Sequence, residues 1–135
     1  MVVQKYITKA LQVDEKVIFY TNSIVGNSCI NLDIEVKKEI DDYFKKTGQH
    51  PIYIQLSIGT LSDPSKLEFK DGNCIYFVFL IDKSAKINVN SRFLKLLSDE
   101  ESRKLKKGQR LAFVHILKFK DNKYVEDLNN FYVCI

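Results

Sequence analysis

The 135-residue sequence predicts an α+β fold, with helices packed on a mostly antiparallel sheet, and three patterns favour it. Residues 36–47 carry apolar side chains at helical spacing, and Gly48 follows at the position where such a helix would stop. Residues 51–59 alternate between apolar and polar side chains, as a half-buried strand does. Residues 74–81 are apolar on both faces, so we expect them to form a strand in the middle of the sheet.

The first third of the chain predicts one further helix and two strands. An apolar helical face indicates a short amphipathic helix at residues 3–12. Residues 16–24 and 28–34 are rich in apolar and β-branched side chains and predict two strands, joined by a turn at 25–27.

The second half predicts a hairpin, a helix and a closing pair of strands. Asp71-Gly72 is a strong two-residue turn signal between a short strand at 67–70 and the long strand. Ser98 and Glu101 form a capping-box pattern. Residues 86–90 predict a short strand. A helical pattern begins within 91–97, and the capping box starts or renews a helix at 99–107. The remaining elements that we expect are a strand at 110–120, a turn at 121–123 and a last strand ending in FYVCI.

The predicted order is α-β-β-α-β-β-β-α-β-β within a single globular domain spanning residues 1–135. Its first eight elements resemble the order of profilin-like and roadblock-type domains, which act as scaffolding or dimerising modules. Alternatively, residues 51–135 resemble an OB-like barrel with an N-terminal ββα extension, a fold that often holds single strands or peptides. No residue motif accompanies either resemblance, so the sequence predicts no family.

Composition limits the classes of function. The chain is 45% hydrophobic and 28% charged, which is typical of a globular domain rather than a disordered chain. It shows no secretion signal and no apolar run long enough to cross a bilayer, so we expect a cytoplasmic protein with no membrane partner. Cys29, Cys74 and Cys134 form no CxxC pair and lie among apolar residues, as inert buried thiols do. Nothing in the pattern predicts a cofactor or a metal site.

A basic surface is one candidate site. Residues 66–135 hold eleven lysines and three arginines against nine acidic residues, which favours an anionic partner. Because the chain has only three arginines, it is poorly equipped to read base edges, and we expect nucleic-acid binding to be sequence-tolerant. The competing interpretation is a solvated helix end. The candidate nucleic-acid-binding residues, within the basic cluster 103–123, are Arg103, Lys104, Lys106, Lys107, Arg110, Lys118, Lys120, Lys123 and Tyr124.

A protein-contact surface is the second candidate, and we favour it. The central strands are apolar on both faces, and the predicted helices offer little to cover them, so part of the sheet is expected to stay open for another protein or a second copy of the chain. The function predicted on this basis is a non-catalytic adaptor, accessory subunit or inhibitor. The candidate interface residues are Tyr53, Gln55, Ser57, Phe131 and Tyr132.

Catalysis is the least favoured interpretation. His115 shares its strand face with apolar residues and is expected to be a core histidine, whereas His50 lies in a loop where a lone histidine is usually solvated. Acidic residues near lysines at 33–37 and 63–70 resemble a metal-dependent nuclease centre, but such strings are common by chance. A hydrolase or nuclease without a known motif is therefore the third alternative, and we name no catalytic residue.

Overall fold

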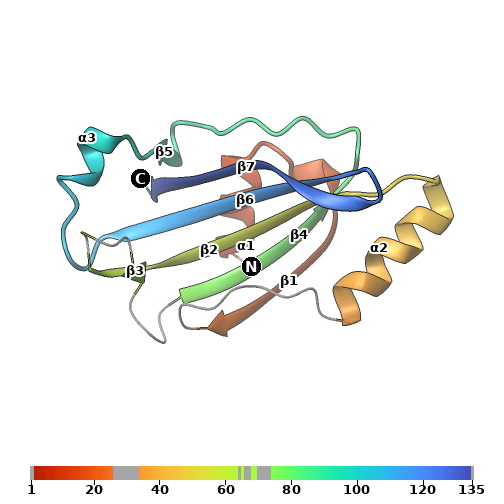
Figure 1. Cartoon of the computed structure of the whole chain (residues 1–135), viewed down its shortest axis with the longest axis horizontal. Helices are drawn as coiled ribbons and strands as arrows, with labels where there is room; N and C mark the ends of the chain where they lie inside the picture. The colour runs from red at the N-terminus through yellow and green to blue at the C-terminus, as the bar shows by residue number, and fades with distance from the viewer. Residues whose placement is uncertain (1, 26–33, 64, 66–67, 70–73, 135) are drawn as a thin grey trace.

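A computed structural model describes residues 2–25, 34–63, 65, 68–69 and 74–134. Figure 1 shows a broad twisted sheet with one helix behind it and another beside one of its ends. The elements, in chain order, are α1 (Val2–Ala10), the short 3₁₀ turn η1 (Asp14–Lys16), β1 (Val17–Val25), α2 (Ile34–Thr47), β2 (Ile52–Asp63), β3 (Glu68–Phe69), β4 (Cys74–Ile81), β5 (Leu94–Leu96), α3 (Asp99–Ser102), β6 (Arg110–Lys120) and β7 (Lys123–Cys134).

The described strands form an open antiparallel sheet in the order β1-β4-β2-β6-β7-β5, with β3 pairing only with β2. The prediction of a sheet-dominated α+β domain with antiparallel strands is confirmed, and the alternative of an OB-like barrel is wrong because these strands do not close. β6 and β7 are joined at Asp121 and Asn122, which have φ values of 54° and 64°. Two successive positive φ values define the tight hairpin turn that Asp and Asn tolerate well.

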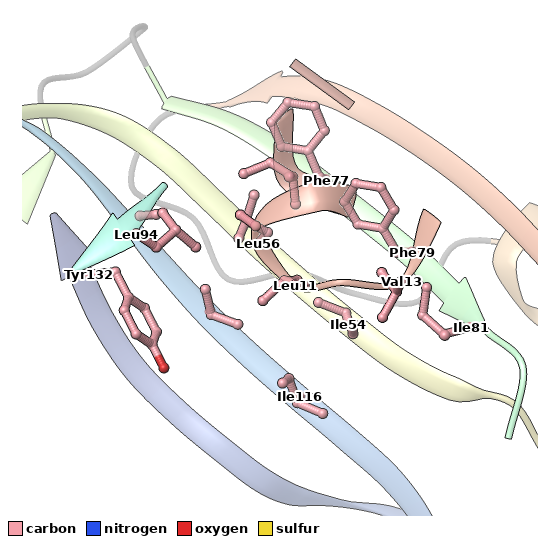
Figure 2. Close-up of a cluster of buried hydrophobic side chains, with 14 of the residues drawn as sticks. Leu11, Val13, Ile54, Leu56, Phe77, Phe79, Ile81, Leu94, Ile116 and Tyr132 are labelled. Carbon is pink, nitrogen blue, oxygen red and sulfur yellow. The ribbon is translucent and has the colours of Figure 1, made fainter. Parts of the chain in front are cut away.

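The first face of the sheet carries the larger core. Leu11 and Val13, at the end of α1, lie among side chains of β2, β4 and β6 (Figure 2). α1 stops because Gln12 adopts a left-handed φ of 57°. The Val13 amide then donates to the Thr8 carbonyl (2.9 Å) and the Gln12 amide to the Lys9 carbonyl (3.2 Å), a Schellman end.

The second face of the sheet is covered by α2 over part of its extent. Val36 and Ile40 of α2 pack against Tyr53, Val78 and Leu80. α2 ends where predicted, because Gly48 has a φ of +74° and its amide donates to the Phe44 carbonyl (2.7 Å).

A polar turn after β4 fixes the position of α2. The Tyr43 hydroxyl donates to Asp82 Oδ2 (3.2 Å) and accepts from the Lys83 amide (3.2 Å). Ser84 donates to Asp82 through its hydroxyl (2.5 Å) and its amide (2.9 Å). These hydrogen bonds, those of Ser84 first, hold the pKa of the Asp82 carboxyl below its usual value.

Residues 86–90, where a strand was predicted, join no sheet in the described structure. Ala85, Ile87 and Val89 alternate toward the first core, as the sequence pattern indicates. The amides of Asn88 and Asn90 instead donate to the carbonyls of Leu11 (3.3 Å) and Ala10 (2.7 Å). The segment therefore satisfies the free carbonyls at the end of α1, which the strand pattern does not reveal.

The helix predicted to begin within residues 91–97 does not form there. The Asn90 side chain accepts from the Arg92 amide (3.0 Å), which turns the chain, and Leu94–Leu96 then pairs with Tyr132–Cys134 as β5. Of the predicted helix 99–107, only α3 forms. Its Ser98 cap is confirmed, because Ser98 Oγ accepts from the Glu101 amide (3.2 Å).

α3 ends before the predicted residue 107 because the residues that follow it are unfavourable for a helix. Beyond Ser102 the helix would place like charges three and four residues apart, at Arg103, Lys106 and Lys107, which is unfavourable. Only Leu105 would offer an apolar contact in return. The predicted strand 28–34 and the turn Asp71-Gly72 lie outside the described residues, apart from Ile34, which begins α2.

Candidate functional site

Part of the second sheet face is not covered by any helix that the structure describes. In Figure 1, β2, β6 and β7 cross in front of α1, and no helix lies in front of their middle portions. Residues two apart on a strand share a face, so this surface continues from Tyr53, which α2 covers. We call it the open face, and its members are Gln55, Ser57, Phe113, His115, Asn129 and Phe131.

Strand register arranges the open face in two rows. Gln55 lies opposite His115, which lies opposite Asn129, and in the next row Ser57, Phe113 and Phe131 are neighbours. The Phe113 and Phe131 rings meet edge to face, with centroids 4.6 Å apart and planes at 89°. All of these side chains are half-buried except Asn129, which is exposed. The surface is therefore preformed, partly apolar and rich in hydrogen-bonding groups.

His115 contacts an acidic residue at the margin of the open face. Its Nε2 lies 2.9 Å from Glu126 Oε1, and the carboxylate is 57% exposed. The Nε2 atom is buried and makes no hydrogen bond to any described residue, so the two side chains are in close contact without a hydrogen bond. The expected core histidine is thus a partly exposed residue beside an acid. No described hydroxyl or thiol hydrogen-bonds to it, so the usual parts of a nucleophilic site are not assembled there.

The structure divides the predicted interface residues. Gln55, Ser57 and Phe131 lie together on the open face. Tyr53 is fully buried beneath α2, and Tyr132, 4% exposed, belongs to the opposite core. These two rings are interior because strand alternation places Tyr132 on the α1 side and because α2 extends over Tyr53. Phe113, His115 and Asn129 were not predicted, since only the register of β6 with β2 and β7 brings them beside Gln55.

The predicted basic cluster is split between the two ends of the sheet. Figure 1 shows α3 and the following loop at one end and the β6–β7 turn at the other. The ten-residue step from Arg110 to Lys120 spans about 33 Å of strand. Arg103, Lys104, Lys106, Lys107 and Arg110 therefore lie far from Lys118, Lys120, Lys123 and Tyr124.

Local partners occupy some of these groups. Lys118 Nζ lies 3.1 Å from Asp127 Oδ2, and Lys104 Nζ lies 3.9 Å from Glu100 Oε1. Tyr124 donates its hydroxyl to the Pro51 carbonyl (2.8 Å). Burial, with smaller contributions from the neighbouring tyrosines, raises the Tyr124 pKa well above its usual value. Tyr124 is accordingly a structural ring rather than an exposed stacking platform.

An aromatic stack at the hairpin end was not predicted as a site. His50 lies parallel to Phe119, with centroids 3.6 Å apart and planes at 11°, and Phe44 lies 4.6 Å from His50 on α2. The expected solvated loop histidine is thus part of a ring stack. Neither the loop nor the strand pattern alone indicates this contact.

Thiol and metal chemistry have little support among the described residues. Burial raises the pKa of the Cys134 thiol, although Arg110 opposes the shift, so this cysteine is a poor nucleophile at neutral pH. The described residues contain no group of three or more His, Cys, Asp or Glu side chains arranged to hold a metal ion. None of the helices in the described ranges is long and apolar enough to span a membrane.

Comparisons of the chain with family models, with curated proteins and with solved structures find no match.

Proposed function

We propose that the protein is a non-catalytic binding module that contacts another protein through the open face. The observation that carries this proposal is a pair of half-buried phenylalanine rings, Phe113 and Phe131, on a sheet surface that no described helix covers. Around the rings lie amide and hydroxyl groups, and the six residues include no lysine, arginine or carboxylate. The centres of protein interfaces share this composition, because aromatic residues are enriched there and charged residues are depleted.

The width of the surface indicates what kind of element it receives. Three adjacent strands span about 10 Å, which matches the diameter of one helix with its side chains. α2 already covers the neighbouring part of the same face through Val36 and Ile40. A helix from the partner protein, with an apolar stripe, would lie beside α2 in the same way.

The uncharged centre disfavours nucleic acid at this place. Nucleic-acid surfaces require cations beside the stacking rings, because phosphate contacts supply most of the affinity. The residues of the predicted basic cluster lie instead toward the two ends of the sheet. Two rows on three strands also cover much less than the roughly 800 Å² per partner of a standard interface, so the contact has to extend over the charged margins.

The test compares two tagged variants in cells of the source organism. Asn129→Arg introduces a charge at the exposed edge of the open face, whereas Lys86→Glu changes an exposed residue on the opposite side of the sheet. We expect the wild type and Lys86→Glu to retain the same proteins and Asn129→Arg to lose them, with affinity at least about 10-fold lower. Retention of the same proteins by all three would contradict the proposal. Sedimentation shows whether the partner is a second 15.7 kDa copy.

A further inference from the structure

We propose that the α1 side of the sheet holds a second binding site, distinct from the open face, for a small amphiphilic carboxylate, that is, an apolar chain ending in one carboxylate group. The site is a groove of about 470 Å³ between the segment 85–90 and the strands β6 and β7. Pockets for small molecules typically measure about 300–1,000 Å³ and combine apolar walls with a few polar groups. This groove has both features.

The groove exists because the segment 85–90 passes β7 without joining the sheet (Figure 1). Paired strands lie about 4.8 Å apart, which leaves no room between their backbones. The amides of Asn88 and Asn90 donate instead to carbonyls at the end of α1. A gap therefore remains between the segment and the strands β6 and β7, and none of the described α1 residues lines it.

Apolar side chains from three parts of the chain line the groove. Ile116 of β6 is 2% exposed and lies opposite Leu128 of β7. Leu128 and Ile87, the latter from the segment 85–90, are half-buried and pack against the first core. An apolar chain lying along the groove would remove their remaining surface from water, which is favourable.

The polar groups of the groove favour a ligand with a single negative charge. Lys86 and Asn88 are exposed, and neither side chain makes an ion pair or hydrogen bond with another described residue. Lys118 already has a partner, because its Nζ lies 3.1 Å from Oδ2 of Asp127 across the two strands. The Lys86 ammonium is therefore the unpaired charge among the lining residues, and a carboxylate is the group that it and the Asn88 amide can bind.

The neighbouring charges on this side of the hairpin are mostly positive. Strand alternation places Lys120 on the same face as Lys118, and Lys123 lies opposite Lys120 in the register of β7. Both side chains are exposed. Asp121 is the acidic residue in the turn between them. These lysines favour the approach of an anion to the groove.

Four other acidic residues of this region do not line the groove. Carbonyls of residues 10–16 accept amides from residues 82–90, so Asp14 and Glu15 lie along the α1 edge of that segment. Asp82 accepts a hydrogen bond from α2, and Glu126 contacts a histidine of the open face. The positive character of the groove is therefore not cancelled by acids within it.

The combination of an apolar floor with one free cation selects among small ligands. A cationic amphiphile would place its charge beside Lys86, which is unfavourable. A short anion such as acetate would contact the lysine but gain nothing from the floor. A carboxylate with an apolar chain can use both features at once.

An NMR titration of the ¹⁵N-labelled protein with octanoate tests the proposal. We expect saturable shifts at the amides of Ile87 and Leu128, with low-millimolar affinity, as befits a ligand of this size. Octylammonium, which has the same chain and the opposite charge, and acetate, which lacks the chain, should each bind at least about 10-fold more weakly.

Two charge reversals provide a matched comparison. Lys86→Glu places a carboxylate beside that of the ligand and should weaken octanoate binding by about 10-fold or more. Lys106→Glu makes the same change beyond α3 and should bind as the wild type does. Because Lys86 lies outside the open face, Lys86→Glu should lose octanoate while it retains the partner protein, so the two proposals fail separately.

Three results would overturn the proposal. The first is the absence of shifts at the groove amides at about 20 mM octanoate, a concentration above the expected dissociation constant. The second is equal binding of octanoate and octylammonium, or shifts that are largest at Phe113 and Phe131 of the open face. The third is an octanoate affinity of Lys86→Glu equal to that of the wild type.

Discussion

Replacement of Tyr53 by alanine tests the division of the second sheet face into a covered and an open part. The Tyr53 side chain is fully buried and packs with Val36, Ile40 and Leu80 between β2 and α2. Truncating a buried aromatic residue removes its burial and leaves a cavity, and such changes cost about 3–5 kcal/mol. Ser57 lies four residues further along the same face but is half-buried, so Ser57→Ala should change stability by about 0.5 kcal/mol or less.

Urea unfolding followed by far-UV circular dichroism measures both variants. A loss of 3–5 kcal/mol is a large share of the roughly 5–15 kcal/mol that stabilises a typical domain, and it should lower Tm by about 10 °C or more. Tyr53→Phe removes only the hydroxyl that accepts from Gln55 Nε2 (3.1 Å) and should cost about 1 kcal/mol. If Tyr53→Ala is no more destabilising than Ser57→Ala, α2 does not cover this part of the sheet and the assignment of the open face fails.

Three further predictions concern individual residues. Gly48→Ala should cost about 1–2 kcal/mol because of the φ of +74°, and Gly48→Asn less; equal stability in urea unfolding would contradict the αL assignment. The lowered pKa of Asp82 implies a stabilisation that is present above the unfolded carboxyl pKa and is lost as pH falls through the folded pKa. Asp82→Asn should therefore be less stable than wild type at pH 7, by about 1 kcal/mol or less, and the difference should vanish in acid; a pH-independent difference would count against it. Cys134 should be alkylated more slowly in the folded than in the unfolded protein, as peptide mass spectrometry would show, and equal rates would exclude the burial effect.

Elements with a strong local pattern were predictable from the sequence. The stripe of α2 and its Gly48 stop, the alternation of β2, the two-sided apolar run of β4 and the pair β6–β7 all appear near their predicted bounds. In these elements the periodicity of apolar residues matches most of the burial that the structure shows, with Tyr53 and Phe44 as exceptions.

The failures arise where distant contacts override the local pattern. Residues 86–90 have a strand pattern, but the amides of Asn88 and Asn90 donate to carbonyls at the end of α1. Residues 94–96 become a strand only because β7 is available to pair with them. Local periodicity cannot indicate such partners.

Predicting the candidate sites required the strand register and the packing of helices on the sheet, which the sequence pattern does not give. The polar face of β2 was predictable, and the structure places the candidate interface residues Gln55, Ser57 and Phe131 on one face of the sheet. The position of Tyr53 under α2 and the approach of His50 to Phe119 depend on how elements pack across the sheet. The residues of the basic cluster are close in sequence but lie toward opposite ends of β6, so closeness in sequence did not predict a single basic patch.

Hydroxyl-radical footprinting of the protein, alone and with a partner retained by the wild type, tests the central proposal most directly. Side-chain oxidation is measured at Phe113 and Phe131 and, for comparison, at Phe44 and Phe93. We predict that the partner protects the first two rings and leaves Phe93, on the α1 side of the sheet, unchanged. Unchanged oxidation of Phe113 and Phe131, with protection elsewhere, would show that the open face is not the surface by which this protein binds.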